Sequence, residues 1–501
     1  MSQAIEALQR NLSGSRLILR NTTEYDELNA SYLSALESDL SPACIFLPST
    51  REEIAEFIKI ISPFVDTGDV AFAIRGAGQV PLPGAANIAN GITMDLRNLT
   101  GVELADGHVS VAAGERWSSV YSKLSAVGLA TTGSRSGNGG IGGLALEGGL
   151  SFFSSREGFV CDNVINYEIV LASGAIVNAN TNSNSDLWLA LKGGANNFGV
   201  VTRYDLRTFT QSPFWGGSVY YYQPSFPSQI EALVTELQKP NPSTQTQIMI
   251  SIGYAAAFGM VACQNQVYYT EDVQNPPVLE PFTAIEPQID ALNSLRPLNL
   301  TSASSEQASD AKGSQRYAYI TKRRIQGDGV NEVERVLTCG RLAYMNIVVK
   351  ADIATLQATS SIYTTAIQTI TSTPGLICSL TLQPYPISLL EKSVANGGNS
   401  LGVSPADGPL VSVLLLTYWQ NESDDTTVLG TMRGALEKIK AESIARDTAV
   451  DYIFMNYASG FQDPIGSYGA ENKKKMQDVS RKYDPAGLFQ KGVPGGFKLF
   501  A

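Results

Sequence analysis

Histidine and cysteine are scarce in this sequence, and long apolar runs are missing from it. The single histidine, His108, lies in the strand-like segment GHVSVAAGE. One histidine argues against a histidine-based metal site and against Ser-His-Asp catalysis. The five cysteines have no CxxC spacing and are odd in number, which argues against a disulfide framework or a structural zinc site. No stretch approaches the roughly 20 apolar residues that a membrane span needs.

An excess of positive charge is missing as well. The formal net charge is −11, and a negative protein repels phosphate backbones and anionic lipid surfaces. We therefore expect neither nucleic acid nor membrane as a partner. The first twenty residues are polar and lack the apolar run of a secretory signal, which predicts an intracellular, cytoplasmic protein.

The composition is that of a globular protein with several packed units. Hydrophobic residues make up 44% and charged residues 17% of the 501 residues, enough for two or three units with a cleft between them. A capping box at Thr50–Glu53 predicts a helix, and short strand-like segments follow up to residue 115. This alternation predicts an α+β fold. The polar stretch 301–315 is predicted to be an exposed loop.

Two glycine-rich segments carry the clearest chemical signal. In the first, Ile74-Arg-Gly-Ala-Gly-Gln79, an apolar strand enters a glycine turn, where backbone N–H groups can converge on an anion such as a diphosphate. A simple tight turn explains these six residues equally well.

The second segment, Gly133–Gly149, holds eight glycines in seventeen residues. It contains a GxGxxG match at Gly137, Gly139 and Gly142, but neither a strand before it nor a helix after it is expected, which disfavours a Rossmann dinucleotide site. Apolar residues within it speak against a flexible linker, in which they would be solvated. We expect its backbone to approach something flat and bulky.

These segments resemble the vanillyl-alcohol-oxidase and berberine-bridge-enzyme-like flavoproteins, which have a PCMH-type FAD-binding fold. The resemblance rests on RGAGQVPLPGAANI, on SRSGNGGIGGLALEGGLSFFSSREGFVCDNV, on SDLWLALKGGANNFGVVTRYDL, and on the closing motifs FMNYAS, SYGAEN, KYDPAGLF and PGGFK in the same order. It covers residues 40–210 and 450–500, whereas residues 212–450 resemble the family only loosely.

The resemblance implies a two-domain fold with an inserted substrate domain, an antiparallel sheet covered by helices. Residues 1–210 would form the first part of the FAD domain, 211–450 the substrate domain, and 451–501 a segment that returns to the FAD domain. The implied FAD contacts are Arg75, Gly76, Ala77, Gly78, Gln79, Gly133, Ser134, Ser136, Gly137, Asn138, Gly139, Gly142, Gly143, Leu144, Gly149, Val200, Asn456 and Tyr457.

Three positions depart from the family's pattern. Gln79 stands where many members place the histidine bonded to the flavin, and Ser136 stands where bicovalent members place a cysteine. The resemblance therefore implies FAD held non-covalently, and such a flavin is a weaker oxidant. Phe454 stands where the family has a tyrosine, so the family's catalytic base cannot be transferred to this chain.

The implied function is an FAD-dependent oxidoreductase, an oxidase or dehydrogenase. It would act on a small organic molecule of fungal specialised metabolism, pass a hydride to flavin N5 and be reoxidised by O₂. A flavin-bound cyclase of the Diels–Alderase kind, without net redox change, is the alternative, and a flavin-binding relic or carrier is a third reading.

Two tyrosines in strand-like segments are the candidate catalytic residues. In PLVSVLLLTYWQNE a strand-like run ends in Tyr418 and Trp419, and Tyr344 lies in GRLAYMNIVVKADI. A tyrosine acts as a base only if its pKa of roughly 10 is lowered by its neighbours. For both tyrosines a packing role is the commoner explanation.

Overall fold

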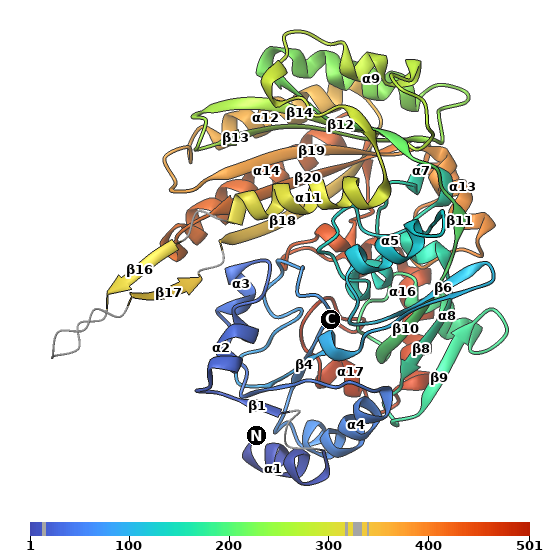
Figure 1. Ribbon diagram of the computed structural model, residues 1–501, viewed down its shortest axis with the longest axis vertical. Helices are drawn as coiled ribbons and strands as arrows, with labels where there is room; N and C mark the ends of the chain where they lie inside the picture. Colours follow the sequence, from blue (N-terminus) through green and yellow to red (C-terminus); the bar gives the residue numbers. More distant parts are fainter. Residues whose placement is uncertain (13–16, 316–318, 324–332, 338–339) are drawn as a thin grey trace.

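The computed structural model describes residues 1–12, 17–315, 319–323, 333–337 and 340–501 (Figure 1). The N-terminal half begins with a four-stranded sheet in which β2, β4 and β3 run parallel and β1 is antiparallel to β2. A parallel pair needs a crossover connection, and α4 (Arg51–Asp66) supplies it between β2 and β3. The capping box predicted at Thr50 and Glu53 is confirmed. The strands are β1 (Leu17–Leu19), β2 (Cys44–Phe46), β4 (Ile92–Asp95) and β3 (Phe72–Arg75).

A five-stranded antiparallel sheet stands beside it, in the order β5-β6-β10-β8-β9. Its strands are β5 (Val102–Ala105), β6 (His108–Ala112), β10 (Val200–Arg207), β8 (Val164–Val170) and β9 (Ile176–Asn180), and the connection from β6 to β8 contains α5 (Trp117–Ser125), β7 (Leu129–Ala130), α6 (Gly142–Leu146) and α7 (Ser154–Glu157).

The second glycine segment lies in this connection. The one-turn helix α6 begins at Gly142, so the expectation of no helix after the glycines was wrong. No strand lies between residues 131 and 141, and the segment is therefore not the strand–turn–helix unit of a Rossmann site.

The third large sheet has eight strands, all from residues 214–450. The order is β15 (Arg296–Leu298), β12 (Phe214–Tyr222), β14 (Met260–Tyr269), β13 (Thr246–Ala255), β19 (Ile377–Tyr385), β20 (Leu410–Trp419), β18 (Arg341–Lys350) and β21 (Ala449–Val450). Neighbouring strands are antiparallel. Helices α9 (Phe226–Leu237), α12 (Ile353–Ile367) and α14 (Asp425–Ala445) cover its outer face in the upper half of Figure 1.

Alternation along these strands separates the two faces of the sheet. On β13, Ile248, Ile250 and Ile252 belong to the core beneath the helices. Because successive side chains of a strand point to opposite faces, Met249 and Ser251 lie on the inner face. That inner face is turned toward the N-terminal half of the molecule.

The polar stretch predicted as an exposed loop is instead the helix α11 (Leu300–Gln315), so that prediction was wrong. The side chain of Asn299 accepts a hydrogen bond from the amide of Ser302 at 2.8 Å, as a helix N-cap does. Ala303 and Ser304 are fully buried, because the helix lies against α5. A tertiary contact thus stabilises a segment whose sequence has a weak helical pattern.

The chain ends by returning to the N-terminal half. Helices α16 (Ala470–Tyr483) and α17 (Leu488–Lys491), red in Figure 1, lie among the blue and green elements. The amide of Phe72 in β3 donates to the carbonyl of Gly492 at 2.7 Å. The remaining α-helices are α1 (Ser2–Asn11), α2 (Thr23–Asn29), α3 (Ala35–Ser38), α8 (Ser185–Leu191), α10 (Glu280–Thr283), α13 (Ile387–Ala395) and α15 (Pro464–Ser467), and a two-stranded hairpin of β16 (Tyr319–Arg323) and β17 (Val333–Leu337) extends from the body.

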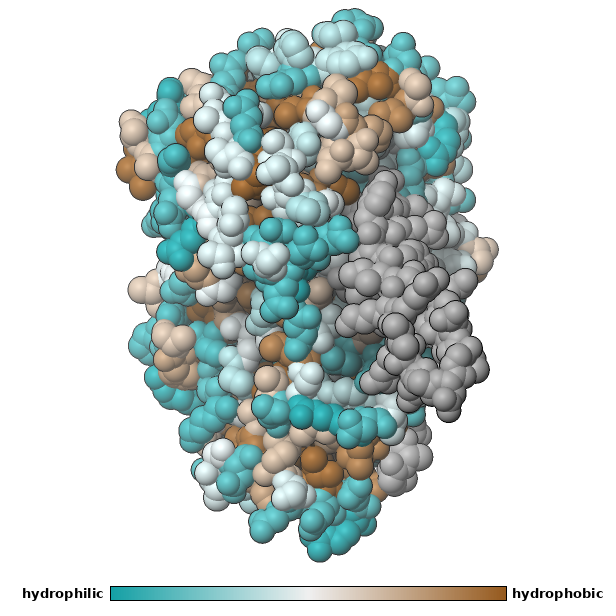
Figure 2. Space-filling model, turned by 90° about the vertical axis from the view of Figure 1, so that its left-hand side faces the viewer, coloured by the Kyte–Doolittle hydropathy of each residue, from teal (hydrophilic) through white to brown (hydrophobic). Residues whose placement is uncertain are grey.

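The surface has no unusual apolar region on the face that Figure 2 shows, where apolar side chains are scattered among polar ones over the described residues. Scattered apolar side chains of this kind are normal on a folded protein. Within the described ranges, no helix combines the length and the apolar composition that crossing a bilayer requires.

Candidate functional site

A cavity of about 490 Å³ lies between the glycine segments and the inner face of the eight-stranded sheet. Pockets of this size are typical of cofactor and small-molecule sites. Its walls come from both glycine segments, from β10, from β13, β14, β18, β19 and β20, and from the C-terminal segment. The cavity therefore joins parts of the chain that are far apart in sequence.

The first glycine segment presents unpaired backbone donors to this cavity. Gly76, Ala77, Gly78 and Gln79 all line it. In the described part of the chain, the main-chain N–H groups of Ala77, Gly78 and Gln79 donate no hydrogen bond to another residue. Consecutive free N–H groups in a turn form a concave binding site for an anion. The turn needs glycine at position 78, where φ is +65° and a Cβ would lie 2.8 Å from Nε of Arg75.

Arg75 itself faces away from the cavity. Its side chain is 1% exposed and pairs with Asp95 at 3.3 Å. It donates to the carbonyl oxygen of Leu28 at 2.8 Å, and its guanidinium carbon lies 3.6 Å from the ring centroid of Tyr32. A guanidinium that is paired and stacked in this way stabilises the segment behind the turn. The side chain of Arg75 therefore supports the backbone of the first glycine segment and does not line the cavity.

The second glycine segment divides into residues that line the cavity and residues that support it. Those at the wall are Ser134, Ser136, Gly139, Gly142, Gly143 and Leu144, of the predicted contacts, together with Arg135, Gly140, Leu146 and Glu147.

Gly133, Gly137 and Asn138 support this wall from behind. A Cβ on Gly133 would lie 2.2 Å from the ring of Trp117, and the amide of Gly137 donates to the carbonyl of Ser304 at 2.9 Å. The carbonyl of Asn138 accepts from Arg116 at 2.5 Å.

The C-terminal segment closes the cavity through Asn456. Its side-chain oxygen accepts from the amide of Gly149 at 3.0 Å, and its amide nitrogen donates to Oε2 of Glu147 at 3.2 Å. Tyr457 and Val200, both predicted contacts, line the cavity, as does Phe454. Gly149 does not line it and takes part through this hydrogen bond.

Glu147 is a cavity residue that the sequence analysis missed. Burial raises the pKa of its carboxyl to about 8, so at neutral pH most of it is protonated. The available signal was that Glu147 is the only acidic residue of the glycine-rich segment. The segment was analysed for its glycines, and this side chain was passed over.

The opposite wall is the inner face of the eight-stranded sheet. It combines amide and hydroxyl groups with apolar and aromatic ones: Met249, Ser251, Gln264, Gln266, Tyr344, Ser379, Thr381, Gln383, Leu414, Leu416 and Tyr418. Apart from the two tyrosines, the sequence analysis named none of these, because strand pairing and not any local motif brings them together.

The two candidate catalytic tyrosines both reach this wall. Burial raises the pKa of Tyr418 to about 12 and that of Tyr344 well above its ordinary value. Both phenols therefore stay protonated at neutral pH, when they can donate a hydrogen bond but cannot accept a proton as a base. The ring of Tyr344 meets that of Tyr457 edge-on, with centroids 5.7 Å apart.

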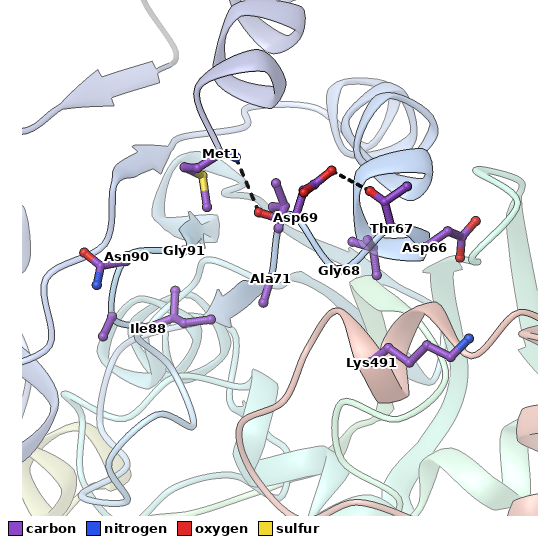
Figure 3. A pocket seen from close by; sticks show the side chains of 13 residues that line it. Met1, Asp66, Thr67, Gly68, Asp69, Ala71, Ile88, Asn90, Gly91 and Lys491 are labelled. Atoms are coloured by element: carbon purple, nitrogen blue, oxygen red, sulfur yellow. Dashed lines mark hydrogen bonds between the residues drawn. The ribbon is translucent and has the colours of Figure 1, made fainter.

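A second hollow lies on the surface near the N-terminus (Figure 3). It is formed by the turn after α4, by residues 88–91 and by Lys491. Its polar groups are satisfied locally: the amino group of Met1 reaches the carbonyl of Asp69 at 3.4 Å, and Thr67 donates to the Asp69 carboxylate at 2.7 Å. No residue of either glycine segment takes part. The internal cavity is therefore the better candidate site.

Solved structures with the same fold include sugar oxidases and plant-type enzymes. The xylooligosaccharide oxidase from Myceliophthora thermophila C1, in complex with xylobiose, superposes with a TM-score of 0.74 at 19% identity, over 97% of both chains. The BBE-like 1 protein of Physcomitrella patens also gives 0.74, at 17% identity over 97% of both chains. At these identities the likeness shows the fold, and it confirms the predicted PCMH-type α+β class.

Sequence relatives decide the family. The family described as "FAD binding domain" matches residues 42–180, a range that contains both glycine segments. "FAD-dependent monooxygenase tpcD" of Cochliobolus heterostrophus is 32% identical over 475 residues, 92% of this chain and 86% of that protein. "FAD-dependent monooxygenase CTB5" of Cercospora nicotianae is 33% identical over 488 residues, 94% of this chain and 99% of that protein.

The chain belongs to the vanillyl-alcohol-oxidase and berberine-bridge-like flavoproteins. It is an FAD-linked oxidoreductase. The resemblance found in the sequence motifs is thus confirmed, and the cavity fits the family's cofactor: free backbone donors at the first glycine segment suit a diphosphate, and glycines without side chains leave room for a flat ring system.

Proposed function

We propose that this chain holds one FAD non-covalently in the internal cavity and uses it to oxidise a small organic molecule. The observation that carries the proposal is the row of three unpaired amides, Ala77 to Gln79, at the cavity wall. Opposite them stands a wall of phenol, amide and apolar side chains suited to an organic substrate. The cofactor diphosphate would bind at the glycine segment, the substrate would bind at the sheet, and the two would meet within the cavity.

Non-covalent attachment is supported by the two departures from the family's pattern. Gln79 and Ser136 both line the cavity. Neither a carboxamide nor a serine hydroxyl replaces the imidazole nitrogen or the thiolate that bonds flavin in other members. We infer that the amides and the shape of the cavity hold the cofactor alone.

Held at the main-chain amides of Ala77 to Gln79, FAD would supply a hydride acceptor, and O₂ would be the final electron acceptor. The protein's part is to orient the substrate and to control protons. Tyr344 and Tyr418 donate hydrogen bonds to substrate oxygen or nitrogen from the sheet, and Asn456 fixes the carboxyl of Glu147. The sheet would thus orient the substrate's reacting C–H bond, and orientation of this kind lowers the barrier to reaction.

The printed names of the relatives support O₂ as the co-substrate, and their fungal sources agree with the role in fungal specialised metabolism that the sequence motifs imply. "Monooxygenase" is the name of the proteins from Cochliobolus heterostrophus and Cercospora nicotianae. We propose the same setting for this chain. The cytoplasmic location predicted from the first twenty residues stays a prediction.

A flavin-bound cyclase is the second candidate. Of the described residues that line the cavity, none is a histidine or a cysteine, and Phe454 offers no phenol. A cavity with few groups able to remove a proton suits a reaction that proceeds through binding and shape. The two functions differ in whether electrons reach the flavin.

One experiment separates these possibilities. The visible spectrum of the purified protein is recorded before and after acid precipitation, and the holoprotein is then mixed anaerobically with candidate phenols, alcohols and amines. We expect flavin in the supernatant and bleaching of the flavin by a substrate. Flavin in the pellet contradicts non-covalent binding, and product without bleaching establishes the cyclase. A colourless protein that takes up no added FAD contradicts the whole proposal.

A further inference from the structure

Arg135 crosses from the second glycine segment to the inner face of the eight-stranded sheet. Its guanidinium donates to Oε1 of Gln383 in β19 at 2.9 Å and to the phenol oxygen of Tyr457 at 2.7 Å. It also contacts the sulfur of Met249 in β13 at 2.7 Å. Three separate parts of the chain thus fix the side chain, which is half-buried and lines the cavity.

None of these partners neutralises the charge of Arg135. An amide oxygen, a phenol and a thioether are all uncharged acceptors. In the described part of the chain, no carboxylate forms an ion pair with Arg135, whereas Arg75 pairs with Asp95 and Arg341 with Asp425. A cation that is partly removed from water without a counter-ion is costly. The cost is recovered if a ligand brings the negative charge.

The rest of the cavity leaves this positive charge uncompensated. Arg135 is the only arginine or lysine, and Glu147 the only acidic residue, among the described residues that line it. Burial raises the pKa of Glu147 to about 8, so its carboxyl is mostly neutral at pH 7. Apart from the cofactor diphosphate proposed at the main-chain amides of Ala77 to Gln79, the cavity therefore holds one positive charge without a counter-ion, in a protein whose net charge is −11. Its low-dielectric walls strengthen the attraction of this charge for an anion.

We propose that Arg135 binds a carboxylate of the substrate, so that the substrate class is a carboxylic acid on a flat, largely apolar skeleton. This inference rests on the proposed function, because it places the substrate between the flavin and the sheet. Among the described residues, Nε of Arg135 finds no hydrogen-bond acceptor, and Nη1 meets only a thioether sulfur, a weak acceptor. Nη2 already donates to Gln383 and Tyr457, so Nε and Nη1, on different edges of the guanidinium, are the atoms that each leave a donor for a carboxylate oxygen. Leu414, Leu416 and Tyr418 supply the apolar surface for the skeleton.

The test compares an aromatic carboxylate with its neutral isostere on the FAD-loaded protein. Benzoate and benzamide are titrated separately, and binding is followed by perturbation of the flavin absorbance and by calorimetry. We expect wild type to prefer benzoate and Arg135→Gln to bind it about tenfold to a hundredfold more weakly, the range for one lost charge-assisted hydrogen bond. The affinity for benzamide should stay the same.

Two further variants make the result specific. Arg156→Gln is the matched control, because Arg156 also donates to two glutamine side chains, Gln245 and Gln211, and does not line the cavity. It should bind benzoate as wild type does. Arg135→Lys keeps the charge but not the fixed planar placement of the donors, so it should lose only part of the affinity; if Arg135→Gln does not fold, this variant carries the comparison.

Three outcomes overturn the inference: a wild-type protein that does not prefer benzoate, a benzoate affinity that is unchanged in the Arg135 variants, or an equal loss of both ligands together with weaker FAD binding. The last outcome would assign Arg135 to the cofactor. In each of these three outcomes, wild type still binds FAD and its flavin is still bleached by a substrate. If the proposed function itself is wrong, wild type does not bind FAD.

Discussion

Glu147 shows how burial alone changes the chemistry of one side chain. Its pKa is raised because burial removes the carboxyl from water, and this disfavours the charged form. Asn456 donates to the carboxyl at 3.2 Å and holds it at the cavity wall. At neutral pH this group is therefore a proton donor beside the cavity.

A stability measurement tests the state of Glu147. Its pKa is about 8 in the folded protein against an ordinary 4.5, so the folded state binds this proton more tightly than the unfolded state. The stabilisation is full below pH 4.5 and is lost as the pH rises to about 8. In urea unfolding of the FAD-free protein, the free energy of unfolding of wild type should fall over this window more than that of Glu147→Gln. The exposed Glu231→Gln is the control, and parallel curves for wild type and Glu147→Gln would contradict the prediction.

The glycine segments are the elements in which the sequence was most informative. Gly78 has a positive φ, and a Cβ there would clash with the buried Arg75. Glycine at this position therefore predicts the turn from the sequence alone. The capped helix α4 and the strands around it were likewise predictable from short-range patterns.

Elements that depend on distant parts of the chain were not predictable. Helix α11 owes its position to contact with α5 and the second glycine segment, and nothing within residues 301–315 reveals that contact. The sheet wall is similar, since Met249 and Gln383 become neighbours of Arg135 only after β13 and β19 pair. The pattern of a single strand fixes which side chains share a face, but not which distant strand supplies the next one.

Gly78→Ala tests the first glycine segment as an anion-binding element. The strain of a non-glycine residue at positive φ costs about 1–2 kcal/mol, and the buried Arg75 cannot move aside. FAD affinity should therefore fall about fivefold to thirtyfold, as measured by fluorescence titration. Gly68→Ala is the matched control, because Gly68 has φ +76° with nothing within 4 Å of a Cβ and lies away from the cavity. It should lower the melting temperature but leave FAD affinity intact; equal FAD affinity in both variants would argue against the loop as the diphosphate site.

Residues from the N-terminal half, the eight-stranded sheet and the C-terminal segment together line one cavity. We propose the division into residues 1–210, 211–450 and 451–501 as the functional units of the molecule. The last of them contacts the second glycine segment through Asn456 and Tyr457, and the sheet through the ring of Tyr457 against Tyr344. A ligand that fills the cavity would contact every unit, so its binding would stabilise the molecule as a whole.

This arrangement predicts a stabilisation by free FAD that depends on its concentration. A ligand held without a covalent bond stabilises the folded state by about 2.7 kcal/mol at one hundred times its Kd, so the melting temperature of FAD-stripped protein should rise steadily as FAD is added. Riboflavin carries the same ring system without the diphosphate and cannot engage the amides of Ala77 to Gln79. At equal concentration it should raise the melting temperature much less. Thermal unfolding followed by tryptophan fluorescence measures both shifts; an equal effect of the two ligands would mean that the ring pocket alone holds the cofactor, and a melting temperature indifferent to FAD would contradict reversible binding.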